Sequence, residues 1–484
     1  MKYQPSKDFI LIILPLGTLV ISLGFGLLPE LEQIEARPIP GEITFKHSKP
    51  ETVLTKTVSS RKSSILSWSM DWFEETYENV MTWEHNPWKR RSSDFGDHFW
   101  KLCESADPND QAKVRELRRL AEAWHQKLRL RFPDLAVPMR NVPDERNGFL
   151  KWLDFADRME AGMTKGTSQI GFPKEITDYL SDKGAWNPEA ANAWLTQQKP
   201  LLDEVRAIGL MPDRSVNGIP IERWGFSSAR LVKGWSDALM MDARLAAEQG
   251  DAATALESVR AARGLGDHFG EVETPSLLAA TVQILVQLNL QNQVMTHILP
   301  ALPPDQVDPE VWENALSPKA SAPADFARLM KGEWAVSSTY FLLPHLLDSE
   351  DPKTPPDSGE LLDFYSTQFS EIVARHEGTA SSDLSGVQWP AIPDDSHLSR
   401  ASRQAIKDLF IGTQAWRRGW DRSQSAQAMA QAAFAIMKGQ PVPTDPVYGA
   451  AYRWDPHTRQ LSAPDTPEFR EWNFKPITVP NIQR

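Results

Sequence analysis

The sequence contains a single cysteine, Cys103, among its 484 residues. One cysteine excludes an internal disulfide and a structural zinc site built mainly on thiolates. An excess of basic residues is also absent, since 52 Lys and Arg stand against 64 Asp and Glu, a formal net charge of −12. Nucleic-acid binding needs a basic surface that displaces counterions from phosphates, so we predict no nucleic-acid partner. The hydrophobic share of 41% is too high for a disordered chain and allows a sizeable core.

Catalytic and metal-binding motifs are missing as well. The ten histidines are scattered, without an H-E-x-x-H or similar spacing, and the sequence has no G-x-S-x-G elbow, Walker loop or EF-hand loop. Residues 264–270, GLGDHFG, have the wrong final spacing for a dinucleotide loop and follow a helical pattern, so we predict a connection between two helices there. Cys103 is interpreted as a small buried hydrophobic residue. We therefore predict no catalytic residue, no metal and no cofactor, and favour a protein that is not an enzyme.

One long hydrophobic run begins at Phe9 and ends at Leu28, with 20 residues and no charge. At 1.5 Å per residue it can cross a hydrocarbon core of about 30 Å. We predict that residues 9–28 anchor the chain in a lipid bilayer as a single transmembrane helix. Lys2 and Lys7 precede it, so residues 1–8 are expected in the cytoplasm and the bulk of the chain outside. The alternatives are a cleaved signal peptide, which would yield a secreted protein, and the reverse orientation.

The rest of the chain predicts a stalk, a helical body and a different tail. Residues 29–64 are rich in Pro, Ser, Thr and Lys and are typical of a flexible stalk. Residues 65–438 follow the helical period and predict an all-α ectodomain of stacked helical hairpins, either a solenoid or an irregular bundle, with a possible sub-boundary near 300–322. The proline-rich tail at 439–484 contains a predicted β-hairpin, with strands at 451–455 and 459–462.

Several helix starts carry a polar cap followed by proline, a pattern that favours the first turn of a helix. Asp107-Pro108, Asn187-Pro188 and Thr274-Pro275 are the clearest cases. Pro200 is expected to kink the helix that begins at Pro188. A long helix over residues 397–438 is expected to break near 421–423, with Gly439 after its end.

Residues 238–265, ALMMDARLAAEQGDAATALESVRAARGL, have a turn signal at Gly250 and Asp251 and small residues at Ala255 and Ala262. The small residues would let two helices approach closely. This stretch resembles one tetratricopeptide (TPR) repeat. The resemblance implies stacked helical hairpins and, in that family, a concave face that binds peptide segments; it transfers no binding residue to this chain.

A second resemblance lies in the tail. Pro443, Asp445, Pro446, Gly449 and Tyr452 look like the P-x-D-P…G…Y segment near the end of secretion-system pseudopilins, which also have an apolar N-terminal helix. One extra residue between Pro446 and Gly449 departs from that pattern. The alternative, which we favour, is a Pro/Gly turn that leads into the predicted hairpin.

Tryptophan is abundant, with 18 residues, and pairs such as Trp416 and Trp420 share a helical face. Indole rings can stack on sugars, and paired carboxylates could then hydrolyse glycosidic bonds. The candidate acids for such a site are Asp94, Asp97 and Glu104, beside Trp88 and Trp100. The alternative is that tryptophan fills the core between helices. Glu333, between Met330 and Trp334, is either a buried acid or a solvent-facing one.

Two functions follow from these observations. The first is a membrane-anchored, non-enzymatic scaffold of the cell envelope that presents a groove to a protein or peptide partner. The second is an envelope hydrolase that acts on glycans. The oligomeric state and the identity of any ligand are not predicted.

Overall fold

A computed structural model describes residues 102, 105, 107–162, 170–181, 183–219, 226–316, 326–347, 358–377, 400–472 and 474–481. The predicted anchor at 9–28, the stalk, and the site candidates Asp94, Asp97, Glu104 and Cys103 lie outside these residues. No helix among the residues so described has the length and apolar character needed to cross a bilayer.

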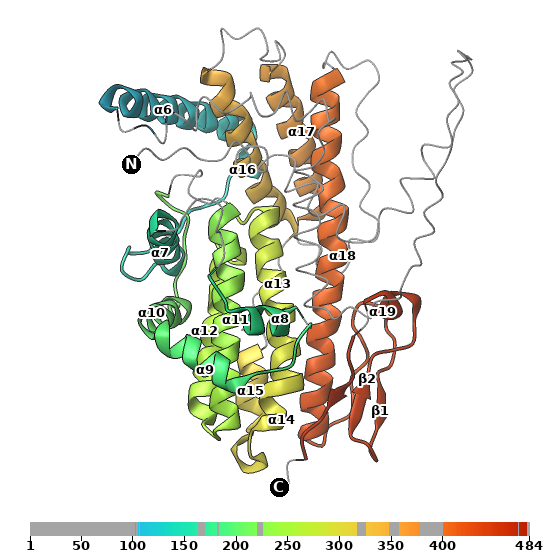
Figure 1. The fold of residues 1–484 in the computed structure, drawn as a ribbon. Helices are drawn as coiled ribbons and strands as arrows, with labels where there is room; N and C mark the ends of the chain where they lie inside the picture. The colour runs from blue at the N-terminus through green and yellow to red at the C-terminus, as the bar shows by residue number, and fades with distance from the viewer. Residues whose placement is uncertain are drawn as a thin grey trace, which may run out of the picture.

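The described chain is mostly helical, as predicted, with one small sheet near its C-terminal end (Figure 1). The α-helices are α6 (Pro108–Arg131), α7 (Gly148–Gly162), α8 (Lys174–Leu180), α9 (Pro188–Gln197), α10 (Lys199–Gly209), α11 (Phe226–Glu248), α12 (Ala252–Gly270), α13 (Leu277–Gln293), α14 (Leu299–Ala301), α15 (Pro309–Leu316), α16 (Phe326–Leu347), α17 (Ser358–His376), α18 (Arg400–Met437) and α19 (Pro467–Trp472). Short 3-10 turns lie at Pro133–Leu135 and Pro304–Gln306, and a π-helical turn, η4, lies at Val294–Ile298. The strands are β1 (Arg453–Asp455), β2 (Gln460–Ser462) and β3 (Ile477–Thr478).

Helices α11, α12, α13 and α18 run side by side and form the body of the molecule (Figure 1). The short helices α7, α9 and α10 pack on one side of this body, and the sheet with α19 lies on the other. Helices α16 and α17 pack together toward one end, where α6 lies across α16. The C-terminal tail therefore packs beside α18 and η4 and does not form a separate layer.

Polar caps start the helices where the sequence predicts them. The Asp107 carboxylate accepts the N–H of Asn109, and the Asn187 side chain accepts the N–H of Ala190. The third start differs, because Ser276 rather than Thr274 caps the helix, which begins at Leu277. The cap bonds satisfy N–H groups that have no partner within the helix.

Two expected irregularities turn out otherwise. Pro200 was expected to kink a continuous helix, but the chain instead ends α9 at Gln197 and starts α10 at Lys199, so that Pro200 lies in a first turn where no N–H is needed. The predicted break of α18 near residues 421–423 is wrong. Arg422 donates to the carbonyl of Trp472 in the tail, so buried polar residues there are held by tertiary contacts while the helix continues.

The turn between α11 and α12 lies at the predicted residues. Gly250 has a φ of 74°, which glycine adopts without steric cost, and the Asp251 carboxylate accepts the N–H of Thr254. Ala255 and Ala262 are fully buried between the packed helices. The helical hairpin of residues 238–265 is therefore present, and the TPR family itself stays a resemblance.

The predicted connection at residues 264–270 is wrong, because these residues form the last turns of α12. Their glycines serve close packing instead. A Cβ on Gly264 would lie 1.8 Å from the carbonyl oxygen of Gly209, and a Cβ on Gly209 would lie 2.2 Å from the carbonyl oxygen of Ala261. Because glycine has no Cβ, the backbones of α10 and α12 can come into direct contact. This tertiary contact outweighs the low helix propensity of glycine at these positions.

The predicted hairpin is confirmed with shorter strands, and a third strand joins it. β1 pairs antiparallel with β2, and β2 with β3, in the order β1-β2-β3. Asp445 is fully buried before this sheet and accepts the N–H groups of Val447 and Tyr448 and the hydroxyl of Tyr452. The segment at 443–452 thus contains a turn held by the Asp445 carboxylate and leads into the hairpin.

Two hydrophobic clusters form the core. The larger one joins helices α7–α15 to the C-terminal part of α18 and the tail, and the smaller one joins α6, α16 and α17 to α13 and Trp420. Trp152, Trp235, Trp312 and Trp334 are fully buried. At these positions tryptophan fills the space between helices.

Candidate functional site

Glu333, the acid singled out in the sequence, is buried in α16, with 9% of the residue exposed. Its Oε2 accepts the N–H of Leu277 at 2.9 Å. Leu277 is the first residue of α13, so the carboxylate stabilises the N-terminus of that helix, where N–H groups lack partners. The structure gives this acid a part in joining α16 to α13.

A second buried carboxylate, Glu273, lies between α12 and α13. Its Oε1 accepts the backbone N–H of Arg140 at 2.9 Å, the Nε–H of Arg140 at 3.0 Å and the hydroxyl of Ser215 at 2.7 Å. Its Oε2 accepts the N–H of Val216 at 3.1 Å. Burial raises the pKa of the Glu273 carboxyl, but the hydrogen bonds from Ser215, Arg140 and Val216 outweigh it and lower the pKa overall. One carboxylate therefore joins three segments far apart in the sequence.

His268 is fully buried near the end of α12, and its Nε2–H donates to the carbonyl of Ile208 at 2.8 Å. Burial lowers the pKa of this imidazole to about 4, with Arg214 acting in the same direction. His268 is thus neutral in the folded protein, which suits a packing role beside Gly148.

This low pKa predicts acid sensitivity. In the unfolded state the His268 imidazole takes up a proton near pH 6.5, whereas in the folded state it does so only near pH 4. The stability that neutral His268 contributes is therefore fully present above pH 6.5 and declines as the pH falls toward 4. We expect His268→Gln to reduce the decline by up to about 1.4 kcal/mol per pH unit in that window. Urea denaturation from pH 7.5 to 4.5 measures it, with the exposed His457→Gln as control. Equal slopes in wild type and His268→Gln would contradict the prediction.

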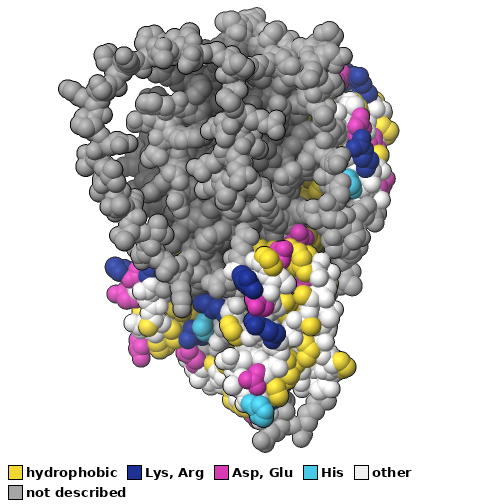
Figure 2. Space-filling model, turned by 90° about the vertical axis from the view of Figure 1, so that its right-hand side faces the viewer, with side chains coloured by type: hydrophobic (Ala, Val, Ile, Leu, Met, Phe, Trp, Pro, Cys, Tyr) yellow, Lys and Arg dark blue, Asp and Glu magenta, His cyan; other side chains and the backbone are white. Residues whose placement is uncertain are grey.

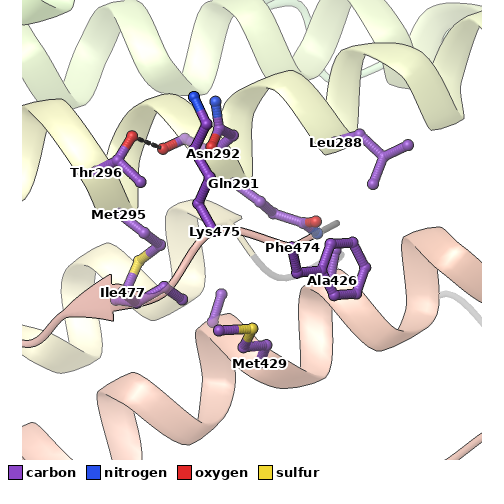
Figure 3. Close-up of a pocket in the computed structure, with 11 residues that line it drawn as sticks. Leu288, Gln291, Asn292, Met295, Thr296, Ala426, Met429, Phe474, Lys475 and Ile477 are labelled. Carbon is purple, nitrogen blue, oxygen red and sulfur yellow. Dashed lines mark hydrogen bonds between the residues drawn. The ribbon is translucent and has the colours of Figure 1, made fainter. Parts of the chain in front are cut away.

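The candidate functional site is a small pocket between α13, η4, α18 and the last segment of the tail (Figure 3). Its volume is about 40 Å³, enough for a few water molecules or one small group of a ligand. The lining residues come from three segments and are Leu288, Gln291, Asn292, Met295, Thr296, Ala426, Met429, Ala430, Phe474, Lys475 and Ile477. Most of the wall is apolar, with two methionines that can adapt to different shapes.

Gln291 is the chemically informative residue of the pocket. Only 5% of the residue is exposed, and its Oε1 has no hydrogen-bond partner in the described part of the chain. A buried carbonyl without a partner costs free energy and is uncommon in native proteins. Figure 3 places the Gln291 side chain among the other lining residues, between α13 and Phe474. Among the lining residues, the enclosed Gln291 Oε1 is thus an acceptor left without a donor in the described part of the chain.

The helix beside Gln291 is irregular. The π-helical turn η4 begins one residue after α13 ends, and it contributes Met295 and Thr296 to the pocket. The Thr296 hydroxyl donates to the carbonyl of Asn292 at 2.6 Å, a bond drawn in Figure 3. Single π-helical turns inside α-helices occur frequently at functional sites. Here the turn widens α13 where the tail crosses it.

Among the lining residues Lys475 is the only titratable one. His297 lies in the same turn of chain, and burial, followed by the positive charges of Arg244 and Lys475, lowers its pKa to about 4. The lining contains no carboxylate, histidine or thiol to act as a paired acid and base. In the ranges that the structure describes, no group of three or more His, Cys, Asp or Glu is placed to hold a metal ion. The polar groups of the lining are the amides of Gln291 and Asn292, the Thr296 hydroxyl and the Lys475 ammonium.

Sequence reasoning did not find this pocket. Its residues lie on segments nearly 190 positions apart, and no local spacing connects Leu288 with Lys475. A signal was present in the polar residues Gln287, Asn289 and Gln291 within an otherwise apolar helix. Comparison with protein-family models, curated proteins and solved structures finds no match for this chain.

Proposed function

We propose that the protein is a membrane-anchored helical scaffold of the cell envelope that binds a protein or peptide partner without catalysing a reaction. The apolar run at 9–28 supports the anchor, and the hairpin of α11 and α12 supports a body built from packed helices. The observation that carries the proposal is the lining of the pocket, which combines apolar walls with the unpartnered Gln291 carbonyl.

The size and chemistry of the pocket suit a short stretch of peptide. A volume of about 40 Å³ accommodates a small side chain rather than a whole residue. An adjoining backbone N–H would satisfy the Gln291 Oε1, and the methionines would adapt to the side chain. The partner is therefore expected to present a small apolar side chain next to a free N–H.

The substitution Gln291→Leu is expected to raise the stability of the protein and to lower its affinity for the peptide. The substitution removes the unpartnered carbonyl, so we expect the free energy of unfolding to rise by about 1 kcal/mol. Peptide affinity is expected to fall about tenfold, because the acceptor for the peptide N–H is lost. Chemical denaturation measures the first effect, and titration of peptides selected by display against the purified full chain measures the second.

Gln287→Leu is the matched control, because Gln287 lies one turn earlier on α13 and does not line the pocket. It should leave peptide affinity unchanged. Selected peptides that bind wild type and Gln291→Leu equally would place the binding site elsewhere. Release of sugars from cell-wall glycan by the full chain would favour the hydrolase hypothesis, with Asp94, Asp97 or Glu104 as its acids.

The envelope location has its own test. A reporter that is active only outside the cytoplasm, fused to the C-terminus, should be active if the basic residues before Phe9 stay inside. A silent reporter would exclude this location for both functions. The mass of the mature protein distinguishes a retained anchor from a cleaved signal peptide.

A further inference from the structure

Helix α6 is basic, although the chain as a whole is acidic. It carries seven Lys or Arg and three Asp or Glu, a formal charge of +4, whereas the whole chain has −12. It lies at one end of the molecule and packs on α16 (Figure 1). In the lower part of Figure 2, on the side that carries the sheet and α19, basic, acidic and hydrophobic side chains of the described residues are intermingled. Helix α18 has the same formal charge of +4, so α6 is one of two basic helices and is distinguished by its position at one end of the molecule.

The two faces of α6 are distinct. Val114, Leu117 and Leu128 are buried on its inner face. Its outer face exposes Leu130 at 84% and Leu120 at 37%, among basic side chains. Exposed leucines interspersed with Lys and Arg are typical of helices that lie in the interface of a membrane.

Part of the positive charge of α6 is uncompensated. Arg119 pairs with Glu116, Arg129 with Glu122, and Arg131 with Asp363 on α17. Lys113, Arg115 and Lys127 make no ion pair with any carboxylate in the described ranges. Because exposed ion pairs contribute little, the paired arginines also remain able to exchange partners.

We propose that α6 binds the anionic headgroups of the bilayer, as a second membrane contact beside the predicted anchor. The inference rests on the proposed function in this respect, because the anchor brings the bilayer near. Seventy-nine residues separate Leu28 from Pro108, and such a tether keeps α6 at high effective concentration near the lipid. Charge complementarity calls for an anionic surface, and the predicted anchor and the exposed leucines favour anionic lipid over a second copy of this acidic chain.

The test uses the full chain in lipid nanodiscs of phosphatidylcholine alone or with phosphatidylglycerol. An environment-sensitive fluorophore is placed on α6 through Ala123→Cys, in a Cys103→Ser background; Ala123 is exposed on the outer face. We expect a blue-shifted emission only with the anionic lipid, reversed by high salt. The triple variant Lys113→Gln, Arg115→Gln, Lys127→Gln should weaken the binding of α6 to the lipid by about a hundredfold. Each removed charge is expected to weaken binding about fivefold.

A control variant, Lys199→Gln with Arg260→Gln and Arg470→Gln, removes three exposed cations from other helices and should leave the emission unchanged. The same emission in neutral and anionic discs would overturn the proposal, as would an unchanged signal in the α6 variant. A shift caused by added poly-glutamate but not by anionic lipid would also overturn it and would indicate an acidic protein partner. Failure of the anchor is measured separately, as loss of the protein from neutral discs during purification.

Discussion

Glu273→Ala is expected to lower the free energy of unfolding by about 3–5 kcal/mol. The substitution removes the acceptor for Arg140, Ser215 and Val216 at once. Two of these donors are buried, so their hydrogen bonds cannot be replaced by water without opening the segment between α12 and α13. Urea denaturation at pH 7 measures the change.

The pH dependence of this effect has a definite sign. The folded-state pKa of Glu273 is lowered, so the stability it contributes is present above its ordinary pKa of 4.5 and is lost as the pH falls below it. The difference between wild type and Glu273→Ala should therefore shrink in acid. Glu257→Ala, an exposed position on α12, is the control and should change stability by less than about 0.5 kcal/mol. A Glu273→Ala protein as stable as this control would contradict the assignment.

Gly264→Ala is expected to lower the free energy of unfolding by about 3 kcal/mol. In a solvent-exposed helix the same substitution usually stabilises by about 0.5–1 kcal/mol, because glycine loses more entropy on folding. Here the added Cβ would lie 1.8 Å from the carbonyl oxygen of Gly209, and backbone cannot move aside as a side chain can. The two helices must separate, so the packing penalty exceeds the entropic gain.

Gly234→Ala on α11 provides the comparison. Its Cβ would lie 2.3 Å from Cδ1 and 3.1 Å from Cγ1 of Ile170, side-chain atoms that can move by a change of rotamer. We expect a change within about 1 kcal/mol, of either sign. Thermal unfolding of the two variants side by side measures the contrast, and a Gly264→Ala protein as stable as wild type would show that α10 and α12 are not in such close contact.

The sequence predicted those parts of the fold that local chemistry determines. Asp107 and Asn187 cap helices because a short polar side chain reaches N–H groups two or three residues ahead. Gly250 turns the chain between α11 and α12 because it tolerates a positive φ. The β-hairpin followed from its turn residues, although β3 pairs across 16 residues and left no local pattern.

Tertiary contacts determined what the sequence did not reveal. The glycines of α12 signal a loop when taken alone, but in the structure Gly264 packs closely on α10, and Gly266 and Gly270 pack on α13. The break expected in α18 at residues 421–423 is absent, because these three polar residues are buried and Arg422 donates to the carbonyl of Trp472 in the tail. The pocket likewise depends on the tail crossing η4, so Gln291 could be noticed as a polar residue but not as an unsatisfied one.

Helices α13 and α18 contribute side chains to both hydrophobic clusters. At 1.5 Å per residue, the 38 residues of α18 extend about 57 Å. If one hydrophobic cluster loosens, α18 can tilt or fray at that end. Because α18 also packs in the other cluster, the change affects both. Amide exchange along α18 would report on both ends of the molecule together, and a change in the packing of α17 can reach the pocket between α13 and α18 through this shared helix.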